Sequence, residues 1–247
     1  EILDVYADHE RFSAIVGPLG PLVTLPERAA GESLGDMIER CRSQIPMGDQ
    51  LTSLDPPRHT RHRALIGKLF TPNRLKENEE FMWTLADGLI DEFVDRGEIE
   101  FSDGYARPFT LLVIADLLGV PHEHHDMFRD WLGGQKGTVG DPEGRHFADR
   151  VFENLHPYFE KYIEERRGAP RDDVLSRMAT VRFPDGELPE VMDVVRLATI
   201  LLAAGQDTTA RLLLSGMRVL AEQPKLADEL RNDPTMIPNF VEECLRL

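Results

Sequence analysis

An acid and an alcohol stand side by side in residues 203–209, which read AAGQDTT at the end of a long apolar stretch. Polar side chains inside a buried helix are destabilising unless another group satisfies or uses them. Asp207 and Thr208 together provide the parts of a proton relay. The Thr208 hydroxyl can also donate to the carbonyl of Ala204 four residues earlier, which loosens the helix there. The alternative interpretation is a helix kink in which both side chains are satisfied.

Gly205 lies within the same segment. A glycine in a helix interior costs about 1 kcal/mol relative to alanine, so its presence needs a reason. Because glycine has no side chain, it leaves a notch in the helix surface that a ligand can approach. The sequence therefore predicts an accessible point beside the acid and the alcohol.

A second group of candidates lies in residues 55–75, which read DPPRHTRHRALIGKLFTPNRL. His59 and Arg63 are four residues apart, so they share one face of a helix. Arginine offers a fork of donors and histidine one more, which suits an anionic ligand. The alternative is a solvated basic helix. Six basic residues stand between Asp55 and Lys76 on an otherwise acidic chain: Arg58, Arg61, Arg63, Lys68, Arg74 and Lys76.

Near the end of the chain, Glu243 and Arg246 are three residues apart, so they share a helical face and can form an ion pair. Surface pairs of this kind are common and contribute little to stability. The pair therefore gains a meaning only in combination with the other motifs.

The cysteines and histidines give no strong metal signal. Cys41 and Cys244 cannot form a disulfide scaffold, and neither has the spacing of a metal ligand. His122, His124 and His125 lie in the sequence PHEHH, where a metal site is one interpretation. A solvated polar loop after a helix-ending proline is the preferred one.

The elements that must position these residues are helices joined by loops that contain proline and glycine. Residues 190–222 form the longest unbroken helical pattern, and Val194 to Ala204 is apolar nearly all round, which predicts a buried central helix. Residues 184–189, PDGELP, predict a turn or small hairpin. Asp55 and the two prolines after it predict the capped start of a helix that ends near Phe70. Further helices are expected at 2–11, 34–41, 76–95, 107–118, 143–167 and from 237 onward.

Composition places the chain among ordinary globular proteins. Its 247 residues are 41% hydrophobic and 29% charged, which argues against disorder. The longest apolar stretch, 197–205, is far shorter than the about 20 residues that a membrane span needs. The net charge of −16 argues against a nucleic-acid partner. The acidic first residues do not resemble a signal peptide, so we expect a cytoplasmic protein.

In this order and spacing, the motifs together resemble the cytochrome P450 family, and the resemblance covers the whole chain. Residues 55–63 are similar to the C helix of that family, and residues 108–121, PFTLLVIADLLGVP, to its E helix and the following loop. AAGQDTT resembles the signature of the I helix, and Glu243-x-x-Arg246 that of the K helix. The resemblance implies a mainly α, partial P450 fold over residues 1–247. As a single domain truncated at both ends, it would run from about the B helix to the K helix, without the haem-ligand loop and most of the β-sheet.

For the candidate residues, the resemblance implies roles around haem b. His59 and Arg63 would bind the haem propionates, and Gly205 would sit in the oxygen groove with Ala204 beside it as a wall of the distal pocket. Asp207 and Thr208 would deliver protons to the dioxygen that haem activates. Glu243 and Arg246 would form a buried ion pair that supports the haem-side core.

For the whole protein, the resemblance implies a monooxygenase that hydroxylates a small or medium apolar organic substrate with dioxygen. Its haem-ligating cysteine would lie beyond Leu247, so we expect this chain to be a fragment of a longer parent protein and inactive alone. An electron donor of the ferredoxin type would dock near Arg58, Arg61, Lys68 and Arg74. The alternatives are a non-enzymatic helical binding protein derived from the same fold, and a helical regulator that binds acidic partners through residues 58–76.

Overall fold

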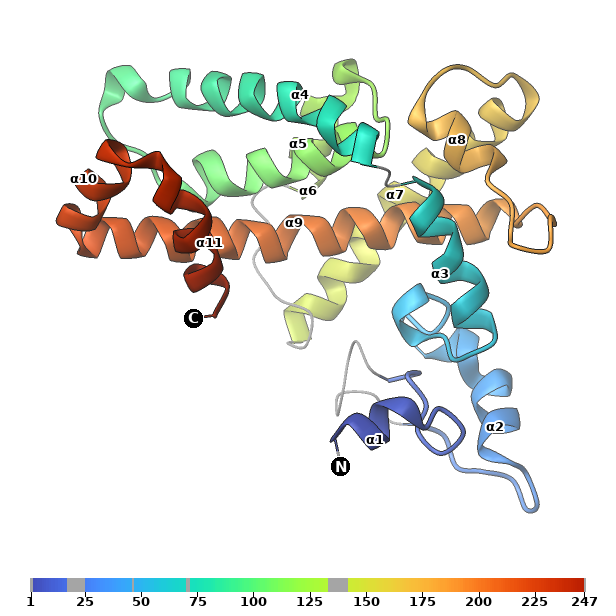
Figure 1. Cartoon of the computed structure of the whole chain (residues 1–247). Helices are drawn as coiled ribbons and strands as arrows, with labels where there is room; N and C mark the ends of the chain where they lie inside the picture. The colour runs from blue at the N-terminus through green and yellow to red at the C-terminus, as the bar shows by residue number, and fades with distance from the viewer. Residues whose placement is uncertain (1, 17–24, 46, 70–71, 133–141, 247) are drawn as a thin grey trace. The chain divides into compact units, whose positions relative to one another are not determined.

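The computed structural model describes residues 2–16, 25–45, 47–69, 72–132 and 142–246 (Figure 1). Within these ranges it does not describe the side chains of residues 6, 73, 74, 77, 132 and 142–153. The described residues contain helices and turns but no strand, which confirms the prediction of a mainly α fold.

Eleven α-helices are found in the described residues, and most lie where the sequence predicted them. The sequence analysis did not predict the helices at 125–132, 174–180 and 224–232. Its other errors are at helix ends: the first helix is shorter than expected, and the helix expected at 76–95 begins earlier. The helices are α1 (Ile2–Ala7), α2 (Leu34–Cys41), α3 (Arg58–Leu69), α4 (Pro72–Asp91), α5 (Arg107–Leu117), α6 (His125–Leu132), α7 (Pro142–Gly168), α8 (Val174–Thr180), α9 (Val191–Glu222), α10 (Pro224–Asn232) and α11 (Ile237–Arg246).

The chain divides into two compact units. Unit 1 comprises Glu1–Leu75 and Gln135–Ile200, and unit 2 comprises Lys76–Gly134 and Leu201–Leu247, so α9 contributes to both. These units are regions of dense internal contact. The expectation of a single partial domain over residues 1–247 stays a prediction.

The core of unit 1 is formed by α7, α8 and the first part of α9. Leu155, Phe159 and Ile163 recur at spacings of four on α7 and are fully buried, as are Leu175 of α8 and Val194 of α9. The spacing of four places the α7 residues on one face, and burial of that apolar face drives the packing.

The start of α3 differs from its predicted form. The Asp55 carboxylate accepts a hydrogen bond from the Ala14 backbone N–H at 2.7 Å and another from the Ser13 hydroxyl, so it ties down an earlier segment and does not cap the helix. Its backbone carbonyl accepts from the His59 N–H at 2.9 Å, which begins the helical hydrogen-bond pattern.

The turn between α8 and α9 confirms the prediction for residues 184–189. The Phe183 N–H donates to the Glu187 carbonyl at 2.9 Å, and the Gly186 N–H donates to the Phe183 carbonyl at 3.0 Å. Gly186 has φ of +89°, a conformation that glycine adopts without strain. We call residues 181–189 the α8–α9 turn.

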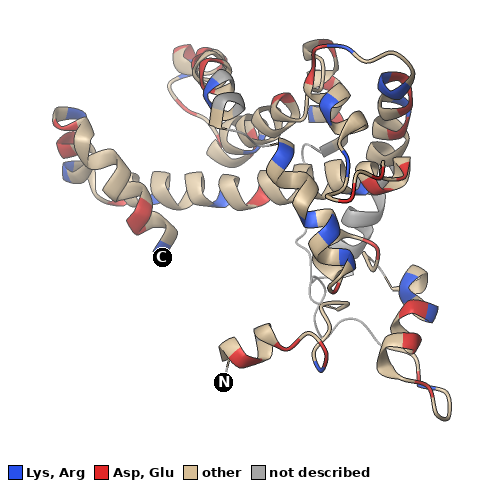
Figure 2. Ribbon diagram, turned by 45° about the vertical axis from the view of Figure 1, so that its right-hand side comes forward, with Lys and Arg blue, Asp and Glu red and all other residues tan. Residues whose placement is uncertain are grey.

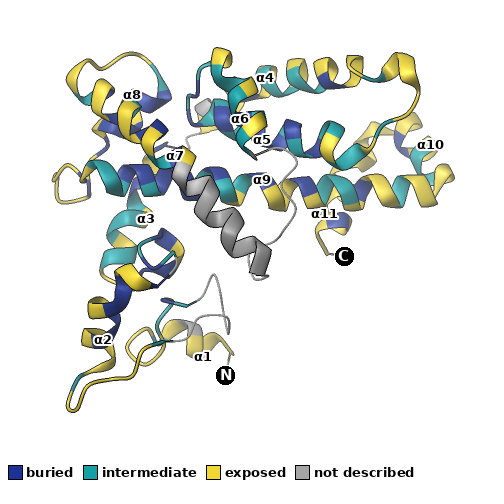
Figure 3. Cartoon of the chain, turned by 180° about the vertical axis from the view of Figure 1, so that it is seen from behind, coloured by how far each residue is buried: buried dark blue, intermediate teal, exposed yellow. Residues whose placement is uncertain are grey.

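In unit 2, α4 and α5 lie side by side in the views of Figures 1 and 3, and α5 packs against α6. Leu111 and Leu118 of this region are almost fully buried, as is Phe128 of α6. The predicted helix stop at 118–121 is confirmed, because Gly119 has φ of +82° and the Val120 N–H reaches back to the Ala115 carbonyl at 2.9 Å.

Helix α9 changes character along its length (Figure 3). Val194, Ala198 and Thr199 in its first part are fully buried, whereas Ala204 and Thr208 are exposed. The prediction of a buried helix therefore holds for the first part only. Within the described residues, no helix is both long enough and apolar enough to cross a membrane.

Candidate functional site

The Lys and Arg residues of α3 are among those coloured blue in Figure 2. Arg61 and Arg63 lie on two flanks of a buried stripe. Leu65 and Leu69 form the stripe. Arg61 is two residues from both His59 and Arg63, and since an α-helix turns by about 100° per residue, it lies about 160° around the helix from each. The helix therefore carries Arg61 on one flank and the His59–Arg63 pair on the other.

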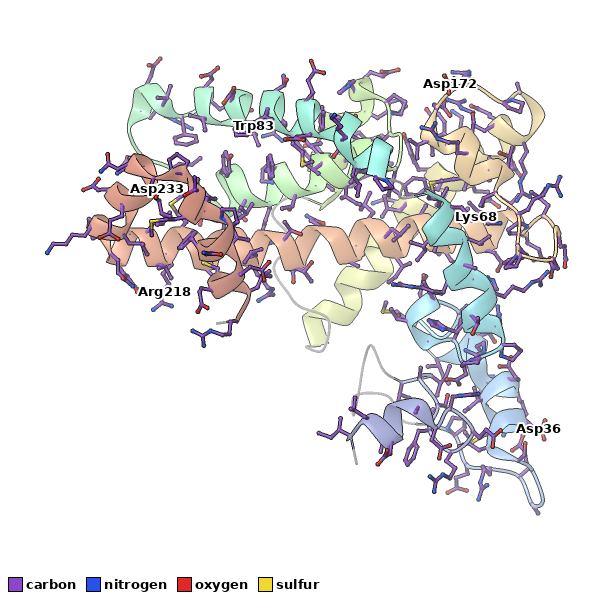
Figure 4. All side chains as sticks on the ribbon, viewed as in Figure 1. Asp36, Lys68, Trp83, Asp172, Arg218 and Asp233 are labelled. Atoms are coloured by element: carbon purple, nitrogen blue, oxygen red, sulfur yellow. The ribbon has the colours of Figure 1, made fainter. Side chains whose placement is uncertain are left out.

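The Arg61 flank is held by the α8–α9 turn. Arg61 forms ion pairs with Asp185 at 3.0 Å and with Glu187, and its guanidinium lies 3.8 Å from the centre of the Phe183 ring. The hydrogen bond to Glu187 is the largest of the effects that raise the pKa of Arg61. Lys68, labelled in Figure 4, donates to the Arg182 carbonyl at 2.7 Å.

These contacts bear on the predicted docking of an electron donor near Arg58, Arg61, Lys68 and Arg74. Arg61 pairs with carboxylates, and Arg58 lies 3.5 Å from the Asp49 carboxylate, so their charges are partly neutralised within the chain. Lys68 contacts a backbone carbonyl and keeps its charge. The side chain of Arg74 lies outside the described residues. The docking surface stays a prediction.

The other flank is free. His59 is half-buried and Arg63 is exposed, and neither side chain has a hydrogen-bond or ion-pair partner among the residues that the structure describes. The two side chains lie on adjacent turns of one flank. They are thus available together to an anion, as the sequence predicted.

On α9, the acid and the alcohol each bond within their own helix. The Thr208 hydroxyl donates to the Ala204 carbonyl at 2.8 Å, which confirms the predicted contact. The Asp207 carboxylate pairs with Arg211 at 2.8 Å, and both side chains are more than half exposed. The sequence analysis missed Arg211, although its spacing of four from Asp207 is a recognised pairing signal.

Gly205 is explained by packing against α5. A Cβ atom placed on Gly205 would lie 3.2 Å from Cγ1 of Ile114, closer than side chains normally approach. The notch predicted for a ligand is therefore filled by Ile114, and the open surface of the motif is at Ala204 and Thr208. The assignment of Gly205 to an oxygen groove stays a prediction, and the expected notch no longer supports it.

The predicted pair of Glu243 and Arg246 forms, with Arg246 Nη2 2.7 Å from the Glu243 carboxylate. Its predicted burial is wrong in this structure, because the side chains are 64% and 69% exposed. An exposed pair contributes at most about 1 kcal/mol, so these residues do not hold this structure together.

Both cysteines are buried. Cys41 packs with Met37, Ile38 and Ile45 in an apolar cluster of unit 1. Cys244 lies in unit 2, where it lines an apolar cavity of about 510 Å³ together with Gly216 and residues of α4, α9 and α11. Ala204, Asp207 and Thr208 are not among the residues that line this cavity. Both thiols are therefore core groups.

The PHEHH segment is more ordered than the predicted solvated loop. His122 begins a short 3-10 turn and His125 begins α6. The two rings lie 4.8 Å apart, each against Phe81. Burial, followed by the charge of His122, lowers the pKa of His125. Among the described residues, no group of three or more His, Cys, Asp or Glu side chains is placed to hold a metal ion.

Comparison with known proteins places the chain in a family. Its sequence is 32% identical over 206 residues to cytochrome P450 YjiB of Bacillus subtilis, covering 81% of this chain and 52% of that protein. It is 34% identical over 193 residues to the vitamin D(3) 25-hydroxylase of Pseudonocardia autotrophica, covering 78% and 47%. The substrate-free structure of cytochrome P450 CYP150A6 from Mycobacterium marinum matches 98% of this chain and 56% of its own, with 46% identity and a TM-score of 0.85. The chain belongs to the cytochrome P450 family.

No protein-family model matches the chain. The chain spans about half the length of the curated P450s that it matches. The family membership and the mainly α, partial P450 fold confirm the corresponding predictions.

The family implies haem, and the described residues fit the edge of this group. The propionates of haem are two carboxylates, and the free donors of His59 and Arg63 suit them by charge and by hydrogen-bond type. Ala204 and Thr208 give unit 2 a small, open patch on α9. The fit does not extend to an axial thiolate, because Cys41 and Cys244 are 1% and 7% exposed in apolar surroundings.

Proposed function

We propose that the parent protein of this chain is a haem-dependent monooxygenase that hydroxylates a small or medium apolar organic substrate. The observation that carries the proposal is how the polar side chains of α3 are engaged: Arg58, Arg61 and Lys68 contact other groups of the chain, whereas His59 and Arg63 have no partner among the described residues. An arginine and a histidine on one flank of a helix suit the binding of carboxylates at the edge of a cofactor.

The names of similar proteins support this reaction class. The chain is 30% identical to cytochrome P450 monooxygenase PikC of Streptomyces venezuelae and 34% identical to the cyclomarin C epoxidase CymV of Salinispora arenicola. It is 30% identical to CYP109E1 of Bacillus megaterium, whose structures hold corticosterone and testosterone. These names indicate oxidation of apolar organic molecules, and they do not select one substrate for this chain.

Haem b with an axial thiolate supplies the activation of dioxygen. In the proposal, Arg63 presents its guanidinium fork to one propionate, and His59 donates a ring N–H to a propionate. Charge-assisted hydrogen bonds of this kind are about twice as strong as neutral ones. The axial cysteine is proposed to lie beyond Leu247, so this chain alone is proposed to be inactive.

On α9, Thr208 and Asp207 are proposed to move protons. The Thr208 hydroxyl is at the open patch, and its hydrogen bond to the Ala204 carbonyl fixes the direction of the oxygen lone pairs. Asp207 is exposed, so it can exchange protons with water, and it needs to leave Arg211 to do so. The acid thus takes protons from solvent and the alcohol passes them on.

A ferredoxin-type electron donor stays part of the proposal, but we do not assign it to the paired residues of α3. We also propose a cytoplasmic location, which agrees with two free thiols and no disulfide among the described residues.

Haem content of the purified parent protein tests the proposal. Arg63→Ala and His59→Ala should each retain less haem than the wild type, by about threefold or more for the loss of a charge-assisted hydrogen bond. Arg218→Ala is the matched control, because Arg218 is an exposed α9 arginine paired only with Glu222. Normal haem content in both variants would refute the propionate roles.

Absence of haem from the wild-type parent, together with no carbon monoxide difference spectrum after reduction, would instead support the non-enzymatic binding protein.

A further inference from the structure

A closed chain of charged groups begins and ends on α3. Arg58 lies 3.5 Å from Asp49, and the other oxygen of Asp49 lies 3.8 Å from Arg196 on α9. Arg196 lies 3.8 Å from Asp193, and Asp193 lies 3.4 Å from His62. Since Arg58 and His62 are one helical turn apart, the chain closes on the same face of α3.

His62 is the member of this network that meets its neighbours through two ring nitrogens. Its Nδ1 lies 2.8 Å from the carbonyl oxygen of Arg58, which only accepts hydrogen bonds, so Nδ1 carries a proton. Its Nε2 faces the carboxylate of Asp193, which is also only an acceptor when ionised. Both nitrogens therefore face acceptors, an arrangement that is fully satisfied when both are protonated.

The surroundings hold the His62 ring in one place. The side chain is 12% exposed, and its ring meets the edge of Phe183 with centres 5.2 Å apart. Phe183 also lies under Arg61, so the α8–α9 turn contacts two consecutive residues of α3. The ring therefore has little freedom to turn away from Asp193.

Asp193 is the fixed acid of the network. The contact with the His62 ring is the largest cause that lowers the pKa of its carboxyl, with Arg196 and Arg58 adding to it and burial opposing it. Other charged groups around His62 and its partners come from four elements: Arg58 and Arg61 of α3, Asp49 before it, Arg182, Asp185 and Glu187 of the α8–α9 turn, and His156 of α7 near Arg196.

We propose that His62 is a positioning residue for the haem-binding flank of α3, and that its contact with Asp193 is strongest when its imidazole is protonated. By helical geometry His59 and Arg63 lie about 60° and 100° around α3 from His62, both in the same sense. Fixing the His62 direction therefore fixes the directions of both. A small rotation of α3 would turn His59 and Arg63 away together.

The inference rests on the proposed function. It adds a contribution to the pH dependence of haem loss beyond that of the proposed propionate contacts, which themselves include a histidine. Histidine side chains change their charge between about pH 5 and 8. The rate of haem loss from the parent protein should therefore be lower at the acidic end of this range and should rise as pH increases. Both propionates remain ionised throughout this range, because carboxylic acids titrate near pH 4.

Two substitutions at His62 separate positioning from general stability. His62→Gln is made in the His59→Ala background, so that no propionate-binding histidine contributes to the pH dependence. Glutamine keeps a side-chain donor toward Asp193 but has no ionisable ring, so haem loss at acidic pH should stay within about twofold of His59→Ala and should no longer depend on pH. His62→Leu keeps the bulk and removes both donors, so haem loss at acidic pH should be about fivefold faster. His9→Gln, at an exposed histidine of the same unit, is the control and should keep the wild-type pH dependence.

A measurement on the protein alone accompanies these rates. Nitrogen NMR of the His62 ring should show both nitrogens protonated at the acidic end, and Asp193→Asn should change the chemical shift of Nε2, the nitrogen that faces this residue. An Nε2 shift that does not change on Asp193→Asn would refute the pairing. The pH dependence of His59→Ala, if it persists unchanged when His62→Gln is added, would refute the positioning role.

The two proposals fail separately. If Arg63→Ala retains haem normally, the proposed function of α3 is wrong. If Arg63→Ala loses haem while His62→Leu matches the wild type at every pH, only the positioning role is wrong.

Discussion

Helices α3 and α9 each carry candidate functional residues, and they hold these polar residues in different ways. On α3, Arg61 and Lys68 are held by residues more than 110 positions later in the chain, in the α8–α9 turn. On α9, Thr208 and Asp207 bond to residues four positions away within the same helix.

Because of this difference, the polar side chains of the two helices are accessible to a ligand or to water for different reasons. On α3, distant partners contact one flank, and in the part of the chain that the structure describes no partner contacts His59 or Arg63 on the other, so this difference comes from the tertiary structure. On α9, the partners are local and exposed, so Asp207 and Thr208 are held by weak contacts that can exchange. A fixed flank suits the binding of a cofactor edge, and exchangeable contacts suit the movement of protons.

The largest expected effect comes from removing the residue that links α3 to the α8–α9 turn. Phe183 is 3% exposed and contacts both His62 and Arg61. Phe183→Ala should lower the free energy of unfolding by about 3 kcal/mol, because it removes a buried ring and leaves a cavity. Urea unfolding of the parent protein measures this change.

Phe12→Ala is the matched control, since Phe12 is a phenylalanine of the same unit that is 48% exposed. Equal effects of the two substitutions would show that the turn does not hold α3, and the contrast between the two helices would lose its basis.

An intermediate effect is expected where α9 does depend on tertiary contact. Gly205→Val would place two methyl groups beyond a Cβ that already meets Ile114 at 3.2 Å, so unfolding free energy should fall by about 2 kcal/mol. The double variant Gly205→Val with Ile114→Ala should recover part of the loss in the same urea titration. No recovery would mean that Ile114 is not what requires glycine at this position.

Much of the fold was predictable because its signals are local. The bounds of α2, α5 and α9 follow from apolar spacing and from helix-ending residues such as Gly119, and the α8–α9 turn follows from PDGELP. Asp55 was misread for the opposite reason. Aspartate before two prolines is a good local capping signal, but the partners that it bonds, Ser13 and Ala14, are about 40 residues away and leave no trace in the local pattern.

In the candidate site, too, the local contacts were predictable and the long-range contacts were not. The contact of Thr208 with Ala204 was foreseen, and the pair of Asp207 with Arg211 was available from spacing alone. The sequence did not predict which basic residues of α3 have partners, because Asp185 and Glu187 contact Arg61 only in the tertiary structure. Gly205 could not be interpreted from the sequence for a similar reason. A glycine in a helix is equally compatible with an open notch and with a close contact to another helix, and only the tertiary structure distinguishes them.

The smallest effect on stability is expected at Asp207. Asp207→Asn removes an exposed pair with Arg211 at a spacing of four, so unfolding free energy should fall by no more than about 0.5 kcal/mol.

Under the proposed function, the same change removes the acid that exchanges protons with water, while the Thr208 hydroxyl keeps its bond to Ala204. Product formed per electron consumed should therefore fall severalfold in the parent protein, with release of peroxide. Arg211→Gln removes the same ion pair and leaves the acid, so it should match Asp207→Asn in stability and the wild type in coupling. If both variants couple normally, Asp207 is only one half of a surface pair, and the proton-transfer role of α9 falls to Thr208 alone.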